Sequence, residues 1–307
     1  MITIGIDTSN YTTSIACYGD DCAENCSQLL PVKQGKLGLR QSDAVFAHTK
    51  SLPELSGRLF SHVETSKIGA IGVSTRPRAV DGSYMPCFMV GYSHAKLLSD
   101  TLKVPLVEVS HQQGHVAASL WSAGRLDLME KAHLAWHLSG GTTELLLVEP
   151  DGKNVRCTRI GGTTDISAGQ LIDRTGVMLD MPFPAGKHLD ELSKTAQMKD
   201  VFQVKCPGME FSLSGVQNKV EQFYEKYKDP AETAGYALRC VITAVTKATV
   251  NALKAYPGLP VVFSGGVASN SMLRQRIADM NPIFALPQYS TDNAMGVAVL
   301  ANRIVEG

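Results

Sequence analysis

The chain has 307 residues, is 44% hydrophobic and 19% charged, and carries a formal net charge of zero. This profile fits a compact protein of two domains and excludes a global electrostatic attraction to nucleic acid or to a membrane. No run of eighteen apolar residues occurs, and the start MITIGIDTSN lacks the regions of a signal peptide, so we expect a cytoplasmic protein. The seven cysteines show no paired zinc spacing, and we expect most of them to be reduced and buried.

The first predicted element is a β-hairpin. In ITIGIDTSNYTTSIACYGDD the residues Ile2, Ile4 and Ile6 alternate with polar or small ones, a polar turn follows, and a second strand ends at a Gly-Asp turn. Further along, AIGVSTRPRAVDG predicts a strand and a loop that lead to a helix from about Cys87 to Leu102.

The next stretch places two histidines at the start of a predicted helix. VPLVEV, residues 104–109, predicts a buried strand, and SHQQGH follows with Ser110 as a good N-cap. His111 and His115 then project from one face, one turn apart, which suits a metal ion. The helical zinc-protease motif needs a glutamate where this chain has Gln112, so a metalloprotease is disfavoured. A surface or core-edge histidine pair is the alternative, and a third ligand must come from elsewhere.

A second copy of the same plan follows. HLAWHLSGGTTELLLVEPDG, residues 133–152, predicts another hairpin, and PVVFSGGVASN, residues 260–270, predicts another strand and loop before the helix SMLRQRIADM. Two unrelated α/β domains are the alternative. We expect an α/β, actin-like duplication of two ribonuclease-H-like lobes around a nucleotide cleft. Residues 1–105 form the first lobe, 106–291 form the second, and helix 292–307 packs back onto the first.

Between these segments lie two predicted scaffold helices. One spans 211–227 and is expected to be capped by Ser212 or Ser214, and the other spans 231–256 and opens after Asp229 and Pro230. The two SGG loops, at 139–141 and 264–266, each end an apolar strand. Glycine lets backbone amides approach phosphate oxygens, so the pair of loops indicates a nucleotide site, although tight turns also need glycine.

The C-terminal segment offers a candidate for the missing ligand. In PIFALPQYSTDNAMGVAVLANRIV a strand and a polar loop precede an amphipathic helix that starts near Thr291. Asp292 could simply cap that helix. A carboxylate added to two imidazoles would suit iron, zinc or manganese and would leave positions open for ligand oxygens.

Together these motifs resemble a known family, the TsaD group of tRNA adenosine threonylcarbamoyltransferases, once described as O-sialoglycoprotein endopeptidases. The resemblance covers most of the chain and rests on motifs that occur in the family's order. They are IGIDTS, SHQQGH, LSGGTTEL, LIDRTGVMLDMPFPAGKHL, FSLSG, FSGGVASN and STDNAM.

The resemblance implies an actin-like fold and a set of site residues. The metal ligands would be His111, His115 and Asp292, with iron or zinc as the ion. The contacts to an adenine nucleotide or to threonylcarbamoyl-adenylate would be His137, Leu138, Ser139, Gly140, Gly141, Asp173, Gly186 and Asn270. The family passes a threonylcarbamoyl group from an adenylate to a tRNA adenosine and works with partner proteins.

The chain also departs from the family pattern. Tyr11 and Thr12 stand where the family carries an Asp-Glu pair, Thr142 replaces a loop histidine, and Gln170 replaces a glutamate. Arg76-Pro77-Arg78 stands where the family has a Gly-Pro-Gly loop, and the Pro-Glu-Leu-Ala-Ser-Arg stretch is not recognisable around residues 40–48. Loss of a positioned acid or base lowers a rate by about a hundred- to ten-thousandfold. Glu144, in place of a family glutamine, is the weak candidate for a replacement carboxylate.

Two functions from different classes follow from these observations. The first is a metal-dependent threonylcarbamoyltransferase acting on tRNA. The second is a catalytically weakened paralogue that serves as a nucleotide- and metal-binding subunit of a complex. Because the net charge is zero, we expect tRNA to be reached through partner proteins, either other threonylcarbamoylation proteins or a homologous subunit. An actin-like small-molecule kinase is disfavoured because it leaves the histidine pair without a role.

Overall fold

The computed structural model describes residues 1–9, 11–19, 21–31 and 39–307. The chain divides into two compact units. The first contains Met1–Ala132, Val148–Cys157 and Gln288–Gly307, and the second contains His133–Leu147 and Thr158–Pro287. The first unit therefore continues past the boundary expected after residue 105. The reason is that the strand and helix that follow residue 105 pair and pack with earlier parts of the same unit.

The first unit is built on a sheet of order β3-β2-β1-β4-β5. β1 pairs with β2 and β2 with β3 in antiparallel fashion, whereas β4 and β5 continue the sheet in parallel. This arrangement confirms the first predicted hairpin and the strand before the SHQQGH stretch. The strands are β1 (Ile2–Ser9), β2 (Thr12–Gly19), β3 (Cys22–Leu29), β4 (Ile68–Arg76) and β5 (Leu106–Ser110).

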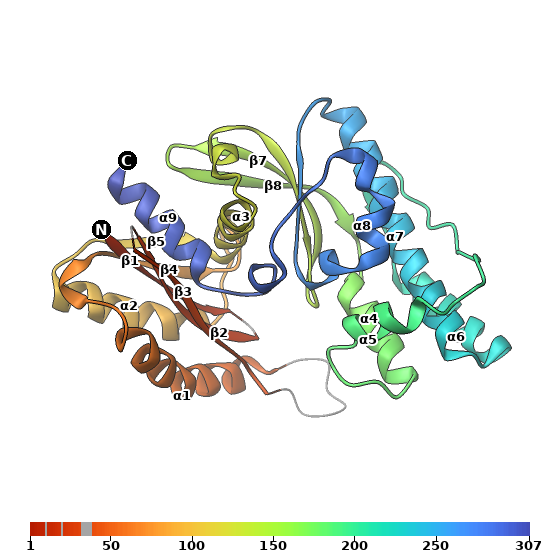
Figure 1. The fold of residues 1–307 in the computed structure, drawn as a ribbon, viewed down its shortest axis with the longest axis horizontal. Coiled ribbons are helices and arrows are strands. Elements are labelled where there is room, and N and C mark those ends of the chain that lie inside the picture. Colours follow the sequence, from red (N-terminus) through yellow and green to blue (C-terminus); the bar gives the residue numbers. More distant parts are fainter. Residues whose placement is uncertain (10, 20, 32–38) are drawn as a thin grey trace. The chain divides into compact units, whose positions relative to one another are not determined.

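Helices cover both faces of this sheet, which is why every residue of β1 is buried. On one face lie α1 (Gln41–Phe60) and α2 (Phe88–Leu102), and the Gly91 amide of α2 donates to Thr8 Oγ1 at 3.0 Å. On the other face lies α9 (Met295–Glu306), with α3 (His111–Ser122) beside it (Figure 1). Gly5 faces α9, so Asp7, two residues further along β1, points to the same side.

The contact between α3 and α9 depends on two glycines. A Cβ built on Gly296 of α9 would overlap the carbonyl oxygen of Gly114 on α3. A Cβ on Gly114 would lie 3.1 Å from Val297 Cγ2. The two backbones therefore approach closely, and this approach places the segment before α9 near the start of α3.

The second unit repeats the strand plan of the first. Its sheet has the order β11-β10-β6-β7-β8-β9, so β8-β7-β6-β10-β11 matches β3-β2-β1-β4-β5. β6 pairs with β10 and β10 with β11 in parallel, as β1, β4 and β5 do. The match confirms the predicted duplication. The strands are β6 (His133–Leu138), β7 (Thr143–Asp151), β8 (Asn154–Thr163), β9 (Glu210–Phe211), β10 (Val261–Ser264) and β11 (Ile283–Phe284).

The long helix of the second unit begins one residue before the predicted start at residue 231. Asp229 caps α7 by accepting from the amides of Ala231 at 2.8 Å and Glu232 at 3.0 Å, and Pro230 is its first residue. α7 packs into the core around Trp136, whose Nε1 donates to Thr249 Oγ1 at 2.9 Å. The helices are α4 (Ala168–Met178), α5 (Gly186–Ser193), α6 (Ser214–Tyr227), α7 (Pro230–Ala255) and α8 (Ser271–Arg276). Short 3-10 helices span Thr65–Lys67, Leu126–Glu130, Gly266–Ser269, Ala278–Met280 and Pro287–Tyr289.

The predicted cap of α6 was wrong. Neither serine caps the helix, and instead Asp165 accepts from the Leu213 amide at 2.8 Å and from the hydroxyls of Ser212 at 2.5 Å and Ser214 at 2.6 Å. Partial burial acts to raise the pKa of Asp165, but these hydrogen bonds outweigh it and lower the pKa to about 2. The cap comes from a distant segment, so the local sequence of α6 could not reveal it.

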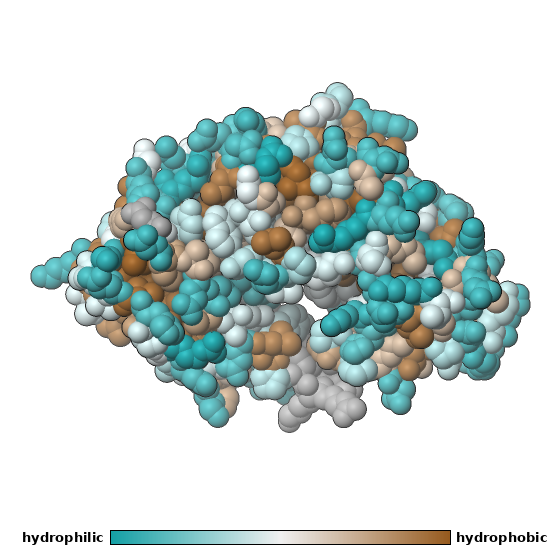
Figure 2. Space-filling view, viewed as in Figure 1, coloured by the Kyte–Doolittle hydropathy of each residue, from teal (hydrophilic) through white to brown (hydrophobic). Residues whose placement is uncertain are grey.

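The expectation that most cysteines are reduced and buried is met only in part. Cys17 and Cys22 form a disulfide, which was not predicted, and the other five cysteines are free. Of these five, Cys26, Cys87 and Cys240 are buried, whereas Cys157 and Cys206 are partly exposed. Hydrophilic residues predominate on the face shown in Figure 2, and hydrophobic ones form small separate groups. Among the described helices, none has the length and apolar character needed to cross a membrane.

Candidate metal and nucleotide sites

The two histidines lie at the start of α3, as the sequence predicted. Ser110 is the N-cap and accepts from the Gln113 amide at 3.2 Å, while the Gln113 side chain accepts from the Ser110 amide at 2.9 Å. This capping box fixes the first turn, so that His111 and His115 face the same side with their ring centres 4.4 Å apart. Their Nε2 atoms are 3.0 Å from each other.

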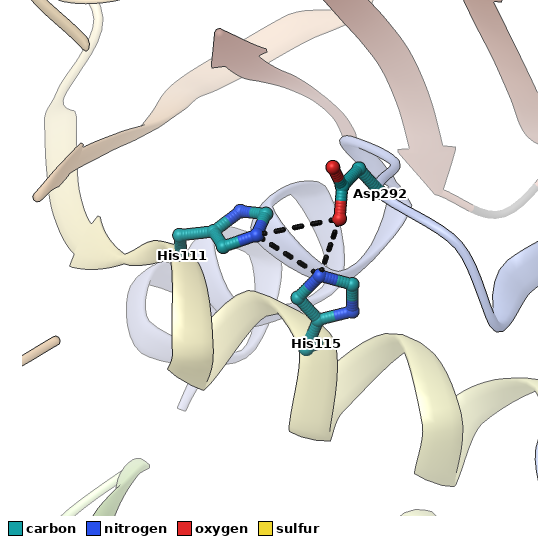
Figure 3. A group of neighbouring side chains, drawn as sticks. All are labelled: His111, His115 and Asp292. Atoms are coloured by element: carbon teal, nitrogen blue, oxygen red, sulfur yellow. Dashed lines mark hydrogen bonds and ion pairs between the residues drawn. The ribbon is translucent and has the colours of Figure 1, made fainter. Parts of the chain in front are cut away.

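Asp292 meets the histidine pair within the first unit (Figure 3). Its Oδ1 lies 3.0 Å from His115 Nε2 and 3.5 Å from His111 Nε2. The alternative that Asp292 caps the last helix was wrong, because α9 begins at Met295 and the Met295 amide donates to Asn293 Oδ1. Asp292 is thus left to face the histidines.

A buried carboxylate, that of Asp7, lies beside His111 and was not predicted as part of the site. Asp7 Oδ2 lies 2.9 Å from His111 Nδ1, and Ser74 donates a hydrogen bond to the other oxygen of Asp7. A carboxylate at Nδ1 keeps a proton on that nitrogen and directs the Nε2 lone pair outward, which is the arrangement of a metal-ligating histidine. The only sequence signal was an acid inside the apolar strand IGIDTS.

The electrostatics of this cluster favour a positive charge at its centre. Burial opposes the charged form of His111 most strongly, but the carboxylates of Asp7 and Asp292 together outweigh it and raise the pKa of His111 to about 10. Burial likewise opposes ionisation of Asp292, yet its hydrogen bonds with His111 and His115 hold its pKa well below the usual range. A field of this kind stabilises a cation.

The donor atoms also fit a metal ion geometrically. One ligand atom from each of the three residues lies within 4.8 Å of the others. In a tetrahedral site with metal–nitrogen distances of about 2.0–2.1 Å, neighbouring ligand atoms are about 3.3 Å apart. The spacings of 3.0, 3.0 and 3.5 Å are close to that value. Two imidazoles and one carboxylate suit iron or zinc and leave coordination positions open.

A cavity of about 340 Å³ in the second unit contains half of the predicted nucleotide contacts. Gly140, Asp173, Gly186 and Asn270 line it, whereas His137, Leu138, Ser139 and Gly141 do not. His137 and Leu138 are buried in β6, and the Ser139 amide closes the β6–β7 turn by donating to Thr142. The remaining lining residues are Gly169, Ile172, Pro184, Lys187, Asp190, Gly266, Val267 and Ser269.

Each SGG loop gives one glycine to this cavity. Within the described residues, no atom lies within 4 Å of a Cβ built on Gly140 or Gly266, so neither glycine is required by protein packing. Gly265 differs, because its φ is +90° and a Cβ there would overlap Leu138. Gly265 thus makes the turn, while Gly140 and Gly266 leave room beside the backbone for a ligand.

Hydrogen bonds within the protein fix the positions of the acidic side chains in the cavity. Asp173 accepts from the Ala185 amide at 2.8 Å, and burial raises the pKa of Asp173. Asp190, which the sequence reasoning did not single out, accepts from Asn270 Nδ2 at 2.9 Å and from the amide and hydroxyl of Ser271 at 3.1 and 2.8 Å. Its position four residues after Gly186 in helix α5 was the available signal.

Glu144 lies on β7 in the second unit, 3.9 Å from Arg159 Nε, with 12% of its side chain exposed. The metal-type cluster belongs to the first unit. The suggested role of Glu144 as a replacement carboxylate stays a prediction.

Comparison with known proteins identifies the family of this chain. The model of the family tRNA N6-adenosine threonylcarbamoyltransferase, TsaD, matches residues 33–299. Proteins of that name from Carboxydothermus hydrogenoformans and a Sulfurihydrogenibium species are each 32% identical. The first match covers 82% of this chain and 75% of the relative, and the second covers 97% and 89%.

Solved structures agree on the fold. HypF from T. kodakarensis matches with a TM-score of 0.65 and 14% identity over 100% of this chain, which spans about half (48%) of the HypF chain. A hexokinase of the ROK type from Thermus thermophilus matches with a TM-score of 0.52 and 14% identity, over 100% of this chain and 99% of the other. These likenesses concern the fold alone, and they confirm the expected actin-like α/β class. The family match and the identities over most of the chain show that this protein belongs to the TsaD family of tRNA N6-adenosine threonylcarbamoyltransferases.

Proposed function

We propose that this protein transfers a threonylcarbamoyl group from threonylcarbamoyl-adenylate to an adenosine of tRNA. The observation that carries the proposal is the cluster of His111, His115 and Asp292, supported by Asp7, in a chain of this family. These residues would hold one divalent ion, iron or zinc. When bound, such an ion supplies positive charge that stabilises charge on the oxygens of an acyl phosphate.

The cavity of the second unit would hold the adenylate. Its open glycines Gly140 and Gly266 let backbone approach the ligand, and Asp173, Asp190 and Asn270 supply polar groups at fixed positions. Groups that are already fixed by hydrogen bonds lose little conformational entropy when a ligand binds, so they orient the ligand well. Acyl transfer by positioning and electrostatics needs no covalent intermediate with the protein.

The tRNA would be reached through partner proteins, because a neutral chain has little general affinity for phosphate backbones. We propose that these partners are other threonylcarbamoylation proteins or a homologous subunit, and that the reaction takes place in the cytoplasm.

The test combines bound-ligand analysis with a transfer assay. Native mass spectrometry of the purified protein should detect one divalent ion per chain and, after incubation, one adenine nucleotide. With threonylcarbamoyl-adenylate, unmodified tRNA and the other proteins of the pathway, nucleoside analysis should detect threonylcarbamoyl-adenosine. A chain that binds both ligands but never yields the product would instead be a binding subunit. A chain that binds neither would contradict the proposal.

A further inference from the structure

Among the described residues that line the cavity of the second unit, Lys187 is the one cation. It is the second residue of α5, and its side chain is exposed. The other charged groups of the lining are the carboxylates of Asp173 and Asp190. Lys187 therefore decides whether the cavity offers a positive group to a ligand.

Both carboxylates already accept hydrogen bonds from the protein. Asp173 accepts from the Ala185 amide, and Asp190 accepts from Asn270 and Ser271. Over the described parts of the chain, Lys187 forms an ion pair with neither of them, unlike Lys194 near the end of the same helix, which pairs with Glu191. The ammonium group of Lys187 thus remains available to a ligand in the cavity.

The helix dipole does not favour a lysine at position 187. The first turn of a helix carries a partial positive charge, so a cation there is unfavourable and an acid is preferred. α5 has no acidic residue in its first turn and places Lys187 there instead. Residues that break a local rule tend to occur at functional or strained sites, and Lys187 lies at the edge of a cavity.

The ligand that this arrangement suits is an anion. The lysine ammonium, the partial charge at the start of α5 and the open space beside Gly140 and Gly266 all favour phosphate oxygens. We propose that Lys187 is a specificity-determining residue that binds a phosphate of the nucleotide, so that the cavity prefers adenine nucleotides to adenosine. This inference rests on the proposed function, because it takes the cavity to be the nucleotide site.

The experiment compares adenosine and 5′-AMP by isothermal titration calorimetry on the full chain. The variants are Lys187→Met, which keeps most of the length without the charge, Lys187→Arg, which keeps the charge, and Lys194→Met as the matched control. Lys187→Met should weaken 5′-AMP binding roughly ten- to a hundredfold, the effect of one charged hydrogen bond, and leave adenosine binding unchanged. Lys187→Arg should restore most of the 5′-AMP affinity, and Lys194→Met should match the original protein.

Unchanged 5′-AMP binding by Lys187→Met, or an equal loss for both ligands, would overturn the inference while leaving the nucleotide site intact. If the unaltered protein bound neither adenosine nor 5′-AMP, the nucleotide site itself would fail, and the role of Lys187 with it.

Discussion

Alanine in place of His115 should lower the affinity of this protein for Zn²⁺ by at least about a hundredfold. Loss of a hydrogen-bonding residue behind a metal ligand already costs about ten- to a hundredfold, so loss of the ligand itself should cost more. His115 contributes the Nε2 atom that lies 3.0 Å from both His111 Nε2 and Asp292 Oδ1. The affinity is measured by competition titration against a chromogenic chelator.

Two further variants separate this effect from damage to the fold. Asp292→Asn preserves the shape of the side chain and should also lose at least about a hundredfold, while Asp7→Asn should lose about ten- to a hundredfold. His62→Ala is the control, since 68% of that histidine side chain is exposed and it lies outside the cluster. If His115→Ala and Asp292→Asn bound zinc with unchanged affinity, His115 and Asp292 would not be metal ligands.

The second large effect concerns the contact that brings Asp292 to α3. Gly296→Ala should lower the free energy of unfolding by about 2–3 kcal/mol, because a methyl group there would overlap the Gly114 carbonyl and push α9 away from α3. The same change should weaken zinc binding, since Asp292 lies just before α9. Urea denaturation and the chelator titration measure the two effects.

A glycine in another helix provides the matched control. Gly57 lies in α1, and among the described residues none comes within 4 Å of a Cβ built there. Gly57→Ala should therefore raise stability by about 0.5–1 kcal/mol, the ordinary gain in helix propensity. If Gly296→Ala were as stable as Gly57→Ala, the close approach of α3 and α9 would not hold.

The sequence predicted those features that depend on local patterns. Alternation of Ile2, Ile4 and Ile6 identified the first strand, and Ser110 and Asp229 marked the starts of two helices. The repeated order of hairpin, strand and helix was enough to predict the duplicated sheets, because strand pairing follows from that order. The histidine pair was readable because residues four apart share a helix face.

Features that depend on distant contacts were not predictable in this way. Asp165 caps a helix that begins 49 residues later, and Asp7 supports a histidine 104 residues away. The sequence around α6 does not reveal Asp165, and the sequence around His111 does not reveal Asp7. The extension of the first unit to Ala132 has the same cause. Asp190 and Lys187 could likewise be recognised as lining the cavity only from the folded chain.

The pairing of His111 with Asp292 was predicted by chemistry and family resemblance, not by spacing along the chain. Two imidazoles needed a third donor, and an acid in the last polar loop was available. With the lobe boundary expected after residue 105, the two histidines and Asp292 would have belonged to different lobes. The structure instead places all three side chains in the first unit.

The most direct test of the metal site is anomalous X-ray diffraction from crystals of the protein grown with Zn²⁺, recorded on both sides of the zinc absorption edge. We predict one strong peak within bonding distance of His111 Nε2, His115 Nε2 and an oxygen of Asp292, at about 2.0–2.2 Å from each. A zinc peak elsewhere on the protein, with these three side chains bonded only to one another, would contradict it.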